Sequence, residues 1–476
     1  MWYDKLEEKK VWEYFQAISN IPRESGNEEG VRAYLISWAK ERNIEVKTDK
    51  IGNVIMFKEG AKGKDPICLQ GHMDMVCVKR EGSTHDFTKD PIEVVLDGNY
   101  IRAKDTSLGA DNGVAVAFAL ALLEENDPQM PPLEALFTVC EESKLLGANN
   151  VEADLIRSRK LINIDSEEEG IIYIGCAGGL QINVEKKVKL KEIDKDSVHL
   201  KLSISGLLGG HSGGEIHKER ANANKLLARI MHRFPIYSLT DIQGGTRSNV
   251  IPSSAYATFV VDKEDEETIK IIVENITADI KNEYKIQDPG ITITLERLED
   301  MPKEAIKNKT SVAFIEAIYL APNGVQAMSQ SVKGVVESSN NIAIISYKDG
   351  KLTALSSTRS LVESAKEETA LRVGAAFELM GFKVIYNDSY PSWAPNTNSA
   401  LTNKVVEEYK NYTGKDAVVT CIHAGLECGI INSLVPGMDS VSIGPNLFDV
   451  HSVNEHIEYD SAVRTMGFLR HLLKSL

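Results

Sequence analysis

The segment CLQGHMDMV, residues 68–76, places a histidine and an aspartate at the end of an apolar run that is typical of a buried β-strand. His72 and Asp74 are two residues apart, so on an extended backbone both side chains point to the same face. A carboxylate beside a histidine fixes the orientation of the imidazole ring and makes the nitrogen that binds a metal more basic. The same pair also occurs in solvated loops, so its meaning depends on the residues that other strands contribute.

Two further apolar runs end in acidic residues. LEALFTVCEES predicts a strand that runs into Glu141 and Glu142, and KLINIDSEEEG predicts one that ends at Asp165. Adjacent carboxylates repel each other unless a positive charge lies beside them, and a divalent metal ion is one such charge. Strands and helices that alternate, with acidic residues at the carboxyl ends of the strands, predict an open α/β sheet with its functional site along that edge.

The stretch DTSLGADNGVAVAFALALLE predicts a buried helix that begins near Gly113. Asp111 then lies at the helix N-terminus, where the backbone dipole favours a carboxylate, and helix capping alone would explain it. A loop that contains His451 precedes an amphipathic C-terminal helix. The chain thus offers two imidazoles and at least three carboxylates at the ends of strands or helices: His72, Asp111, Glu141 or Glu142, Asp165 and His451.

Nitrogen and carboxylate ligands without thiolates suit zinc, cobalt or manganese in an open catalytic site. A carboxylate that bridges two metal ions, with two further ligands on each ion, would use five residues and leave one glutamate free as a base. That arrangement is typical of a two-metal hydrolase. The six cysteines form no C-x-x-C pair, and we expect them to be reduced core residues.

The length of 476 residues predicts two domains, and 42% apolar with 26% charged residues is typical of a soluble globular protein. The net charge of -15 argues against nucleic acid and anionic membrane surfaces as partners. The N-terminus MWYDKLEEKK lacks the layout of a signal peptide, and no apolar run is long enough to span a membrane. We therefore expect a cytoplasmic protein.

Around residues 175–179 the buried runs give way to longer strands with alternating polar and apolar residues, which indicates a second domain. Near the Pro-, Ser- and Asn-rich SYPSWAPNTN the chain returns to the first domain. We expect a first domain built from 1–187 and 391–476, interrupted by an inserted domain at 188–390. From about residue 308 the insert repeats an order of helix, strands and helix, which suggests an internal duplication of a β-α-β-β-type unit.

The chain resembles the aminoacyl-histidine dipeptidase (peptidase D) branch of the di-zinc metallopeptidases, which also include carboxypeptidases, tripeptidases and deacylases. The resemblance is carried, in order along residues 71–452, by nine motifs: GHMDMV, LGADNGVAVA, TVCEES, INIDSEEEG, GGHSGGEIHKERANA, GGTRSNVIP, SSTRSLVESA, HAGLECG and IGPNLFDVHS. It implies an α/β catalytic domain with a mixed sheet, formed by 1–187 and 391–476, and an α+β lid domain at 188–390.

By that resemblance, one zinc ion would be bound by His72, Asp111 and Asp165. The other would be bound by Asp111, Glu142 and His451, so that Asp111 bridges the two ions. Zinc is the expected metal, with cobalt or manganese as alternatives.

Further roles follow from the same resemblance. Asp74 would orient the imidazole of His72, and Glu141 would be the general base that takes a proton from the metal-bridging water. A cis peptide bond is expected between Asp111 and Asn112. These roles describe metal-dependent hydrolysis of a peptide bond.

The resemblance also implies residues that bind the substrate. His211 would stabilise the scissile carbonyl oxygen, and Arg359 would bind the substrate carboxylate with two parallel hydrogen bonds. Asn249 would help to hold the peptide, and the backbone around Gly425 would line the pocket. His211 would act either when the lid closes or across a homodimer formed through the lid domain, and the sequence leaves these two open.

The leading hypothesis is a dipeptidase of the Xaa-His type, with broad side-chain tolerance and a short peptide with a free amino end as substrate. An N-acyl amino acid deacylase would use the same two metals, and only recognition of the substrate amine separates the two; one of the glutamates at 167–169 could supply it. A binding protein that keeps the fold without catalysis is a third hypothesis, and the complete set of ligand positions argues against it.

The sequence departs from the pattern of the family at Cys140 and Lys144, which lie beside the glutamate pair 141–142.

Overall fold

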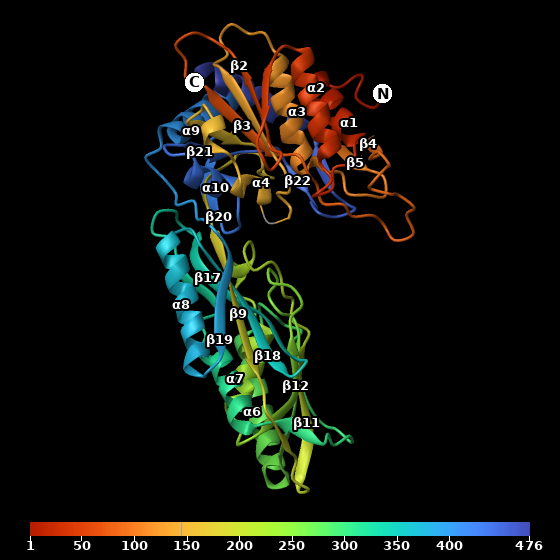
Figure 1. The fold of residues 1–476 in the computed structure, drawn as a ribbon, viewed down its shortest axis with the longest axis vertical. Helices are drawn as coiled ribbons and strands as arrows, with labels where there is room; N and C mark the ends of the chain where they lie inside the picture. The colour runs from red at the N-terminus through yellow and green to blue at the C-terminus, as the bar shows by residue number, and fades with distance from the viewer. Residues whose placement is uncertain (144) are drawn as a thin grey trace. The chain divides into compact units, whose positions relative to one another are not determined.

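The computed structural model describes residues 1–143 and 145–476, which form two compact units (Figure 1). Unit 1 comprises Met1–Cys176, Pro395–Cys421 and Leu426–Leu476. Unit 2 comprises Ala177–Ala394 and Ile422–Gly425. Most of unit 2 is therefore a single insertion into the chain of unit 1. The short segment Ile422–Gly425 also belongs to unit 2.

Unit 1 is built around a mixed eight-stranded sheet. Its strands follow the order β1 (Glu45–Thr48), β2 (Val54–Lys58), β6 (Leu133–Thr138), β3 (Ile67–His72), β7 (Lys160–Asn163), β21 (Asp439–Ser442), β8 (Ile171–Cys176) and β20 (Val418–Ile422). The four central strands, β6, β3, β7 and β21, run parallel. The carboxyl ends of these strands therefore lie at one edge of the sheet.

Helices cover the sheet of unit 1. They are α1 (Lys9–Ser19), α2 (Glu29–Glu41), α3 (Ala110–Glu124), α4 (Leu146–Asn149), α9 (Ala400–Thr413), α10 (Glu427–Leu434) and α11 (Tyr459–Ser475), with a short 3-10 helix η1 (Ala153–Leu155). The apolar α3 packs on β3 and β6, and α1 packs on α3, whereas α9 and α10 pack on β21 (Figure 1). All residues of β3 and β6 are buried, as expected for parallel strands covered by helices.

A second sheet of unit 1 has the order β22 (Leu447–Phe448), β23 (His456–Glu458), β5 (Tyr100–Ala103) and β4 (Val94–Asp97). β22 and β23 flank the loop that carries His451. Because β23 pairs with β5, this loop is tied to the part of the chain that leads into α3. The small sheet thus brings the C-terminal histidine close to the N-terminal acidic segment.

Unit 2 contains an antiparallel sheet of nine strands. Eight follow the order β14 (Thr292–Arg297), β11 (Ser197–Ser205), β13 (Ala255–Asp262), β12 (Ser238–Gly244), β17 (Val336–Lys348), β18 (Lys351–Ser360), β9 (Gly178–Lys187) and β19 (Lys383–Tyr390), and β16 (Gly324–Met328) pairs with β17. A separate ribbon joins β10 (Leu190–Glu192) and β15 (Glu304–Ile306). The helices are α5 (Ala223–Met231), α6 (Glu266–Glu283), α7 (Asn308–Leu320) and α8 (Glu363–Leu379), with η2 (Ile216–Lys218) and η3 (Lys263–Asp265).

The same arrangement occurs twice in unit 2. β11, α5, β12, β13, α6 and β14 form a β-α-β-β-α-β unit whose strands lie in the order fourth, first, third, second. The second copy repeats the order of elements along the chain and the order of strands in the sheet, and it consists of β9, α7, β17, β18, α8 and β19. The two copies meet where β12 pairs with β17. The series expected from residue 308 corresponds to α7 onward. The first strand of the second copy, β9, precedes every element of the first copy in the chain. The first copy is therefore inserted within the second.

The core of unit 2 combines side chains from both copies, among them Leu202 and Phe259 from the first and Ile342 and Phe377 from the second. The expected fold class, a mixed α/β catalytic domain with an inserted antiparallel domain, is confirmed. Within the described residues, no helix combines the length and the apolar character that crossing a membrane requires.

Candidate metal centre

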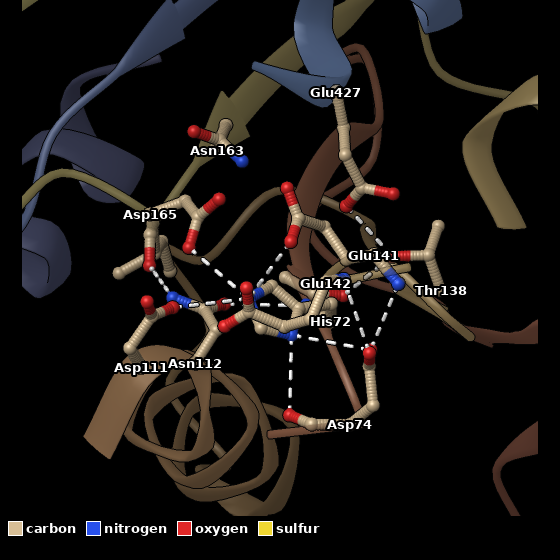
Figure 2. Close-up of polar contacts among 12 residues, drawn as sticks. His72, Asp74, Asp111, Asn112, Thr138, Glu141, Glu142, Asn163, Asp165 and Glu427 are labelled. Carbon is tan, nitrogen blue, oxygen red and sulfur yellow. Dashed lines mark hydrogen bonds and ion pairs between the residues drawn. The ribbon is translucent and has the colours of Figure 1, made fainter. Parts of the chain in front are cut away.

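Three parallel strands of unit 1 end close to acidic or histidine residues (Figure 2). His72 is the last residue of β3, Glu141 and Glu142 follow the end of β6, and Asp165 follows the end of β7. His72 lies opposite the last residue of β6 in the ladder, so the strand ends are aligned. The parallel register thus gathers these side chains at one edge.

Asp111, in the first turn of α3, lies between two imidazoles. Its Oδ1 is 3.0 Å from His72 Nε2, and its Oδ2 is 3.0 Å from His451 Nε2. Asp165 Oδ1 is 3.6 Å from His72 Nε2, and Glu142 Oε1 is 2.8 Å from His451 Nε2. The ligand atoms form two groups of three, each within 4.8 Å, that share Asp111: His72, Asp111 and Asp165, and Asp111, Glu142 and His451.

Glu141 belongs to a looser group with His72 and Glu142. Its Oε2 is 4.0 Å from His72 Nε2, which is longer than the contacts of Asp111. Burial raises the pKa of Glu141 well above its usual range, and the charges of Glu427 and Glu142 raise it further, against the opposing effect of His72. Glu141 is thus the acidic residue of the cluster least engaged by the imidazoles.

The carboxylates of the cluster favour the protonated form of both imidazoles. Hydrogen bonds to Asp111 and Glu142 raise the pKa of His451 to about 11. Burial alone would lower the pKa of His72, but Asp111 and Asp165 raise it well above its usual range. Divalent cations would replace these protons, because the same nitrogen and oxygen atoms are metal ligands. The donor set therefore fits zinc, cobalt or manganese.

Asp74 contacts both the first histidine and the glutamate pair. Its Oδ1 lies 3.3 Å from His72 Nδ1 and accepts a hydrogen bond from the backbone N–H of Glu141 at 3.0 Å. Its Oδ2 accepts from the N–H of Glu142 at 3.2 Å and from the hydroxyl of Ser25 at 2.7 Å. Although burial opposes ionisation, these partners lower the pKa of Asp74 to about 2. One carboxylate thus fixes the imidazole ring and the start of the glutamate loop together.

The peptide bond between Asp111 and Asn112 is cis. The buried Asn112 side chain donates to the backbone oxygen of Ile164 at 2.7 Å and accepts from the N–H of His72 at 3.2 Å. A Cβ at Gly71 would lie 2.3 Å from Asn112 Oδ1, so only glycine leaves room for this contact. Asn112 therefore ties the ends of β3 and β7 to the start of α3.

Two buried charged residues hold the loop before α3, and the sequence analysis missed both. Glu455 accepts hydrogen bonds from four successive backbone N–H groups, those of residues 108–111, at 2.8 to 3.2 Å. Arg23 donates to the backbone oxygens of Met73, Asp74 and Gly109 at 3.1, 3.0 and 2.5 Å. These contacts join segments far apart in the chain and leave no local sequence pattern.

The remaining expected site residues belong to unit 2. His211 Nδ1 accepts a hydrogen bond from the N–H of Gly214 at 3.0 Å, so the neutral ring carries its proton on Nε2. Burial and the charge of Arg359 lower the pKa of His211 to about 4, which keeps the ring neutral near pH 7. Nε2–H of His211 is therefore available as a hydrogen-bond donor.

Arg359, His423 and His211 surround Gly213. A Cβ on Gly213 would lie 2.5 Å from the backbone oxygen of His423, 3.0 Å from His211 Cε1 and 3.3 Å from Arg359 Nε. Arg359 donates to the hydroxyl of Tyr390 at 2.9 Å and is 9% exposed. Burial and Arg359 also lower the pKa of His423 to about 3. Unit 2 thus places the guanidinium of Arg359, the ring of His211 and the backbone of His423 close to one glycine.

Asn249 and Gly425 also lie in unit 2. The backbone oxygen of Asn249 accepts from the N–H of Ser212 at 2.9 Å, next to His211, and its side chain is exposed. Gly425 closes the short segment that contains His423.

Cys140 precedes the glutamate pair and is a poor candidate for a reactive thiolate. Its Sγ lies 3.2 Å from Glu28 Oε1, and its backbone N–H donates to the same oxygen at 2.9 Å. Burial and the Glu28 carboxylate raise the pKa of the thiol to about 11. Lys144, the other departure from the usual pattern, lies outside the described residues.

Comparison with known proteins identifies the family. Residues 202–288, in the first copy of unit 2, match the M20 peptidase dimerisation domain. A cytosol non-specific dipeptidase of Escherichia coli (strain K12) is 37% identical over 478 residues, which cover 99% of this chain and 98% of that protein. The chain belongs to the M20 family of peptidases. The expected aminoacyl-histidine dipeptidase branch is confirmed by the full-length similarity.

Solved structures agree with this membership. An aminoacylhistidine dipeptidase from Vibrio alginolyticus superposes on this M20 peptidase with a TM-score of 0.92 and 34% identity, covering 100% of this chain and 98% of the other. Aminopeptidase PepT from Bacillus cereus shares the fold, with a TM-score of 0.58, 16% identity and 98% coverage of both chains. The expectation that the chain is a metallopeptidase is confirmed. The assignment of individual ligands and substrate residues stays a prediction.

Replacing Asp111 by Ala should lower the bound metal from about two ions per chain to less than one, because Asp111 belongs to both groups of ligands. Metal content after dialysis, measured by plasma mass spectrometry, checks this. Asp165→Ala is the matched control, since Asp165 belongs to one group only and its loss should release about one ion. Retention of both ions by Asp111→Ala would contradict the shared-ligand assignment.

Proposed function

We propose that this M20 peptidase hydrolyses dipeptides with a free amino end, with Xaa-His dipeptides among its substrates and broad tolerance of side chains. The observation that carries the proposal is the sharing of Asp111 between two groups of metal ligands in a protein of the dipeptidase branch. The relative from Vibrio alginolyticus, described as an aminoacylhistidine dipeptidase, supports the substrate class. Zinc is the proposed metal, with cobalt or manganese as alternatives.

His72, Asp111 and Asp165 would hold one ion, and Asp111, Glu142 and His451 the other. When bound, the two ions supply Lewis-acid chemistry that acidifies the attacking water and polarises the peptide carbonyl. Asp74 orients the imidazole of His72 through Nδ1 and at the same time fixes the backbone of the glutamate pair.

Glu141 accepts the proton of the attacking water and passes it to the leaving amine. Two features support this role: Glu141 is the acid least engaged with the imidazoles, and burial raises its pKa, so that its carboxylate is more basic than usual. A base of raised pKa holds the proton long enough to deliver it to the departing nitrogen.

His211 and Arg359 supply the substrate contacts. His211 donates its Nε2–H to the carbonyl oxygen as negative charge develops there. Arg359 binds the C-terminal carboxylate, which favours short peptides with a free carboxyl end. Asn249 and the backbone at Gly425 line the peptide site. These groups belong to unit 2 and the metal ligands to unit 1, and we infer that His211 acts either when the lid closes or across a homodimer.

We also infer a cytoplasmic location and a homodimer formed through unit 2. The name of the Escherichia coli relative, a cytosol dipeptidase, supports the location. The match to the dimerisation domain supports the dimer, as do β14 and β19, the two strands at the ends of the sheet of unit 2.

The competing function, deacylation of N-acyl amino acids, differs in how the substrate nitrogen is recognised. A free ammonium group needs a carboxylate partner, whereas an acylated nitrogen does not. Of the glutamates at 167–169, Glu169 is bound by Arg464 through two contacts at 2.8 and 2.6 Å. Glu167 lies within electrostatic range of Asp111 and His451. It is therefore the better candidate to bind the substrate amine.

Hydrolysis of a substrate panel separates these functions. Metal-reconstituted protein should hydrolyse Xaa-His and other free-amine dipeptides faster than tripeptides and N-acetyl amino acids, because the site is built for both charged ends of a short peptide. Release of amines, measured by chromatography, checks this. Faster hydrolysis of N-acetyl amino acids would establish the deacylase, and full metal content without hydrolysis of any amide would indicate a binding protein.

Replacing Glu141 by Gln should lower kcat by about a hundredfold or more, because the amide cannot accept a proton. Metal content should change little, since Glu141 belongs to neither group that shares Asp111. Steady-state kinetics and plasma mass spectrometry on the same preparation check both expectations. Unchanged turnover with full metal content would reject Glu141 as the base.

Replacing Arg359 by Lys should raise KM for dipeptides about tenfold with a smaller effect on kcat, because lysine keeps the charge but cannot form two parallel hydrogen bonds. Dipeptide amides, which lack the carboxylate, are the matched control and should be hydrolysed equally well by both proteins. A similar loss on the dipeptide and on its amide would contradict carboxylate binding by Arg359.

A further inference from the structure

A row of buried polar side chains crosses the central sheet of unit 1 beside the metal centre. Gln70 on β3, Asn163 on β7 and Ser442 on β21 lie directly opposite one another in the ladder. Asn163 Nδ2 donates to Gln70 Oε1 at 2.6 Å, and Ser442 Oγ donates to Asn163 Oδ1 at 2.5 Å. All three side chains are at most 1% exposed. Parallel central strands are usually apolar, so this polar row needs an explanation.

The row ends at one carboxylate, that of Glu427 in the first turn of α10. Glu427 Oε2 accepts from Gln70 Nε2 at 2.5 Å. It also accepts from Thr138 Oγ1 at 2.7 Å (Figure 2). The donors of the row all point toward Glu427: Ser442 donates to Asn163, Asn163 to Gln70, and Gln70 to the carboxylate. Hydrogen bonds aligned in one direction polarise one another, so they stabilise negative charge at their end.

Glu427 has no exposed surface, and its other oxygen, Oε1, has no hydrogen-bond partner among the described residues. Its two donors come from the strand ends that carry the metal ligands: Gln70 precedes His72 by two residues on β3, and Thr138 lies opposite His72.

We propose that Glu427 is a positioning residue of the metal centre: its hydrogen bonds join the ends of β3 and β6, and its carboxylate adds a negative charge that strengthens the binding of divalent cations. This inference rests on the two-metal centre proposed above. Burial raises the pKa of Glu427 to about 7, and the hydrogen bonds from Thr138 and Gln70 oppose this rise, so the carboxylate is largely ionised at pH 8. Because Glu427 is buried, water screens that charge little.

A purely structural role would make other demands. A buried carboxylate costs free energy, and apolar residues of similar volume would hold strands together at lower cost. The charge itself would then be dispensable. Replacement by the isosteric Gln tests this directly, because it keeps an oxygen that can accept both hydrogen bonds and removes only the charge.

Glu134 provides a matched control. It lies on β6, four residues before Thr138 and toward the other edge of the sheet, and it is also fully buried. Its carboxylate accepts the backbone N–H groups of Arg157 and Ser158, both at 3.0 Å. Glu134→Gln therefore removes a buried charge from the same sheet without removing one that faces the metal centre.

The experiment compares full-length wild-type, Glu427→Gln and Glu134→Gln proteins after removal of metal. Zinc affinity is measured at pH 8 by competition with a chromophoric chelator. The visible absorption spectrum of the cobalt-loaded protein reports the ligand field of the metal. Circular dichroism and thermal unfolding report the fold. We expect Glu427→Gln to bind zinc about tenfold more weakly and to change the cobalt spectrum, because one charge near a divalent ion is lost. Glu134→Gln should match the wild type in both.

A pair of substitutions at Thr138 keeps the test open if Glu427→Gln fails to fold. Thr138→Val removes the hydroxyl that donates to Glu427, and Thr138→Ser keeps it. Zinc binding should weaken about threefold in the Val variant and recover in the Ser variant, in line with the loss of one hydrogen bond to a charged group. Equal zinc affinity and cobalt spectra in the wild type and the Gln or Val variant would overturn the inference. A wild-type protein that binds no zinc would instead overturn the two-metal centre itself.

Discussion

Mutual repulsion among carboxylates is the constraint on which the architecture of unit 1 depends. Parallel strands bring Glu141, Glu142 and Asp165 to one edge of the sheet, and α3 adds Asp111 from the side. Several negative charges in a poorly hydrated place are unfavourable unless positive charge is shared among them. The carboxylate of Asp111 has one oxygen toward each imidazole. This arrangement allows two cations to share one carboxylate.

The surroundings of the site keep these charges in place by using the backbone. Asp74 and Glu455 accept six backbone N–H groups between them, and each thereby fixes a loop that carries ligands. Arg23 donates to backbone oxygens in two loops, the one after β3 and the one before α3. Loops held by several buried hydrogen bonds lose their conformational freedom during folding. The candidate metal ligands are therefore held in place by side chains outside the groups of candidate ligands.

Unit 2 solves a different problem, because it has to present polar groups from a sheet with a single apolar core. Two copies of one β-α-β-β-α-β unit pair through β12 and β17, which extends the sheet and covers two edges that would otherwise be open. His211, Arg359 and the backbone of His423 lie around Gly213, and burial together with the guanidinium lowers the pKa of both imidazoles. A cation beside two uncharged rings suits recognition of an anionic peptide end and a carbonyl oxygen.

The sequence by itself determined the elements and the residue types at their ends, because burial periodicity and strand length are local properties. His72 at the end of β3, Asp165 after β7 and Asp111 at the start of α3 can be recognised in the sequence for that reason. Only the tertiary structure decided which side chains support them. Glu455 is more than 340 residues from the amides that it binds, and Glu427 is 357 residues from Gln70. Contacts of that separation depend on strand order and nested insertion, which leave no periodic trace in the sequence.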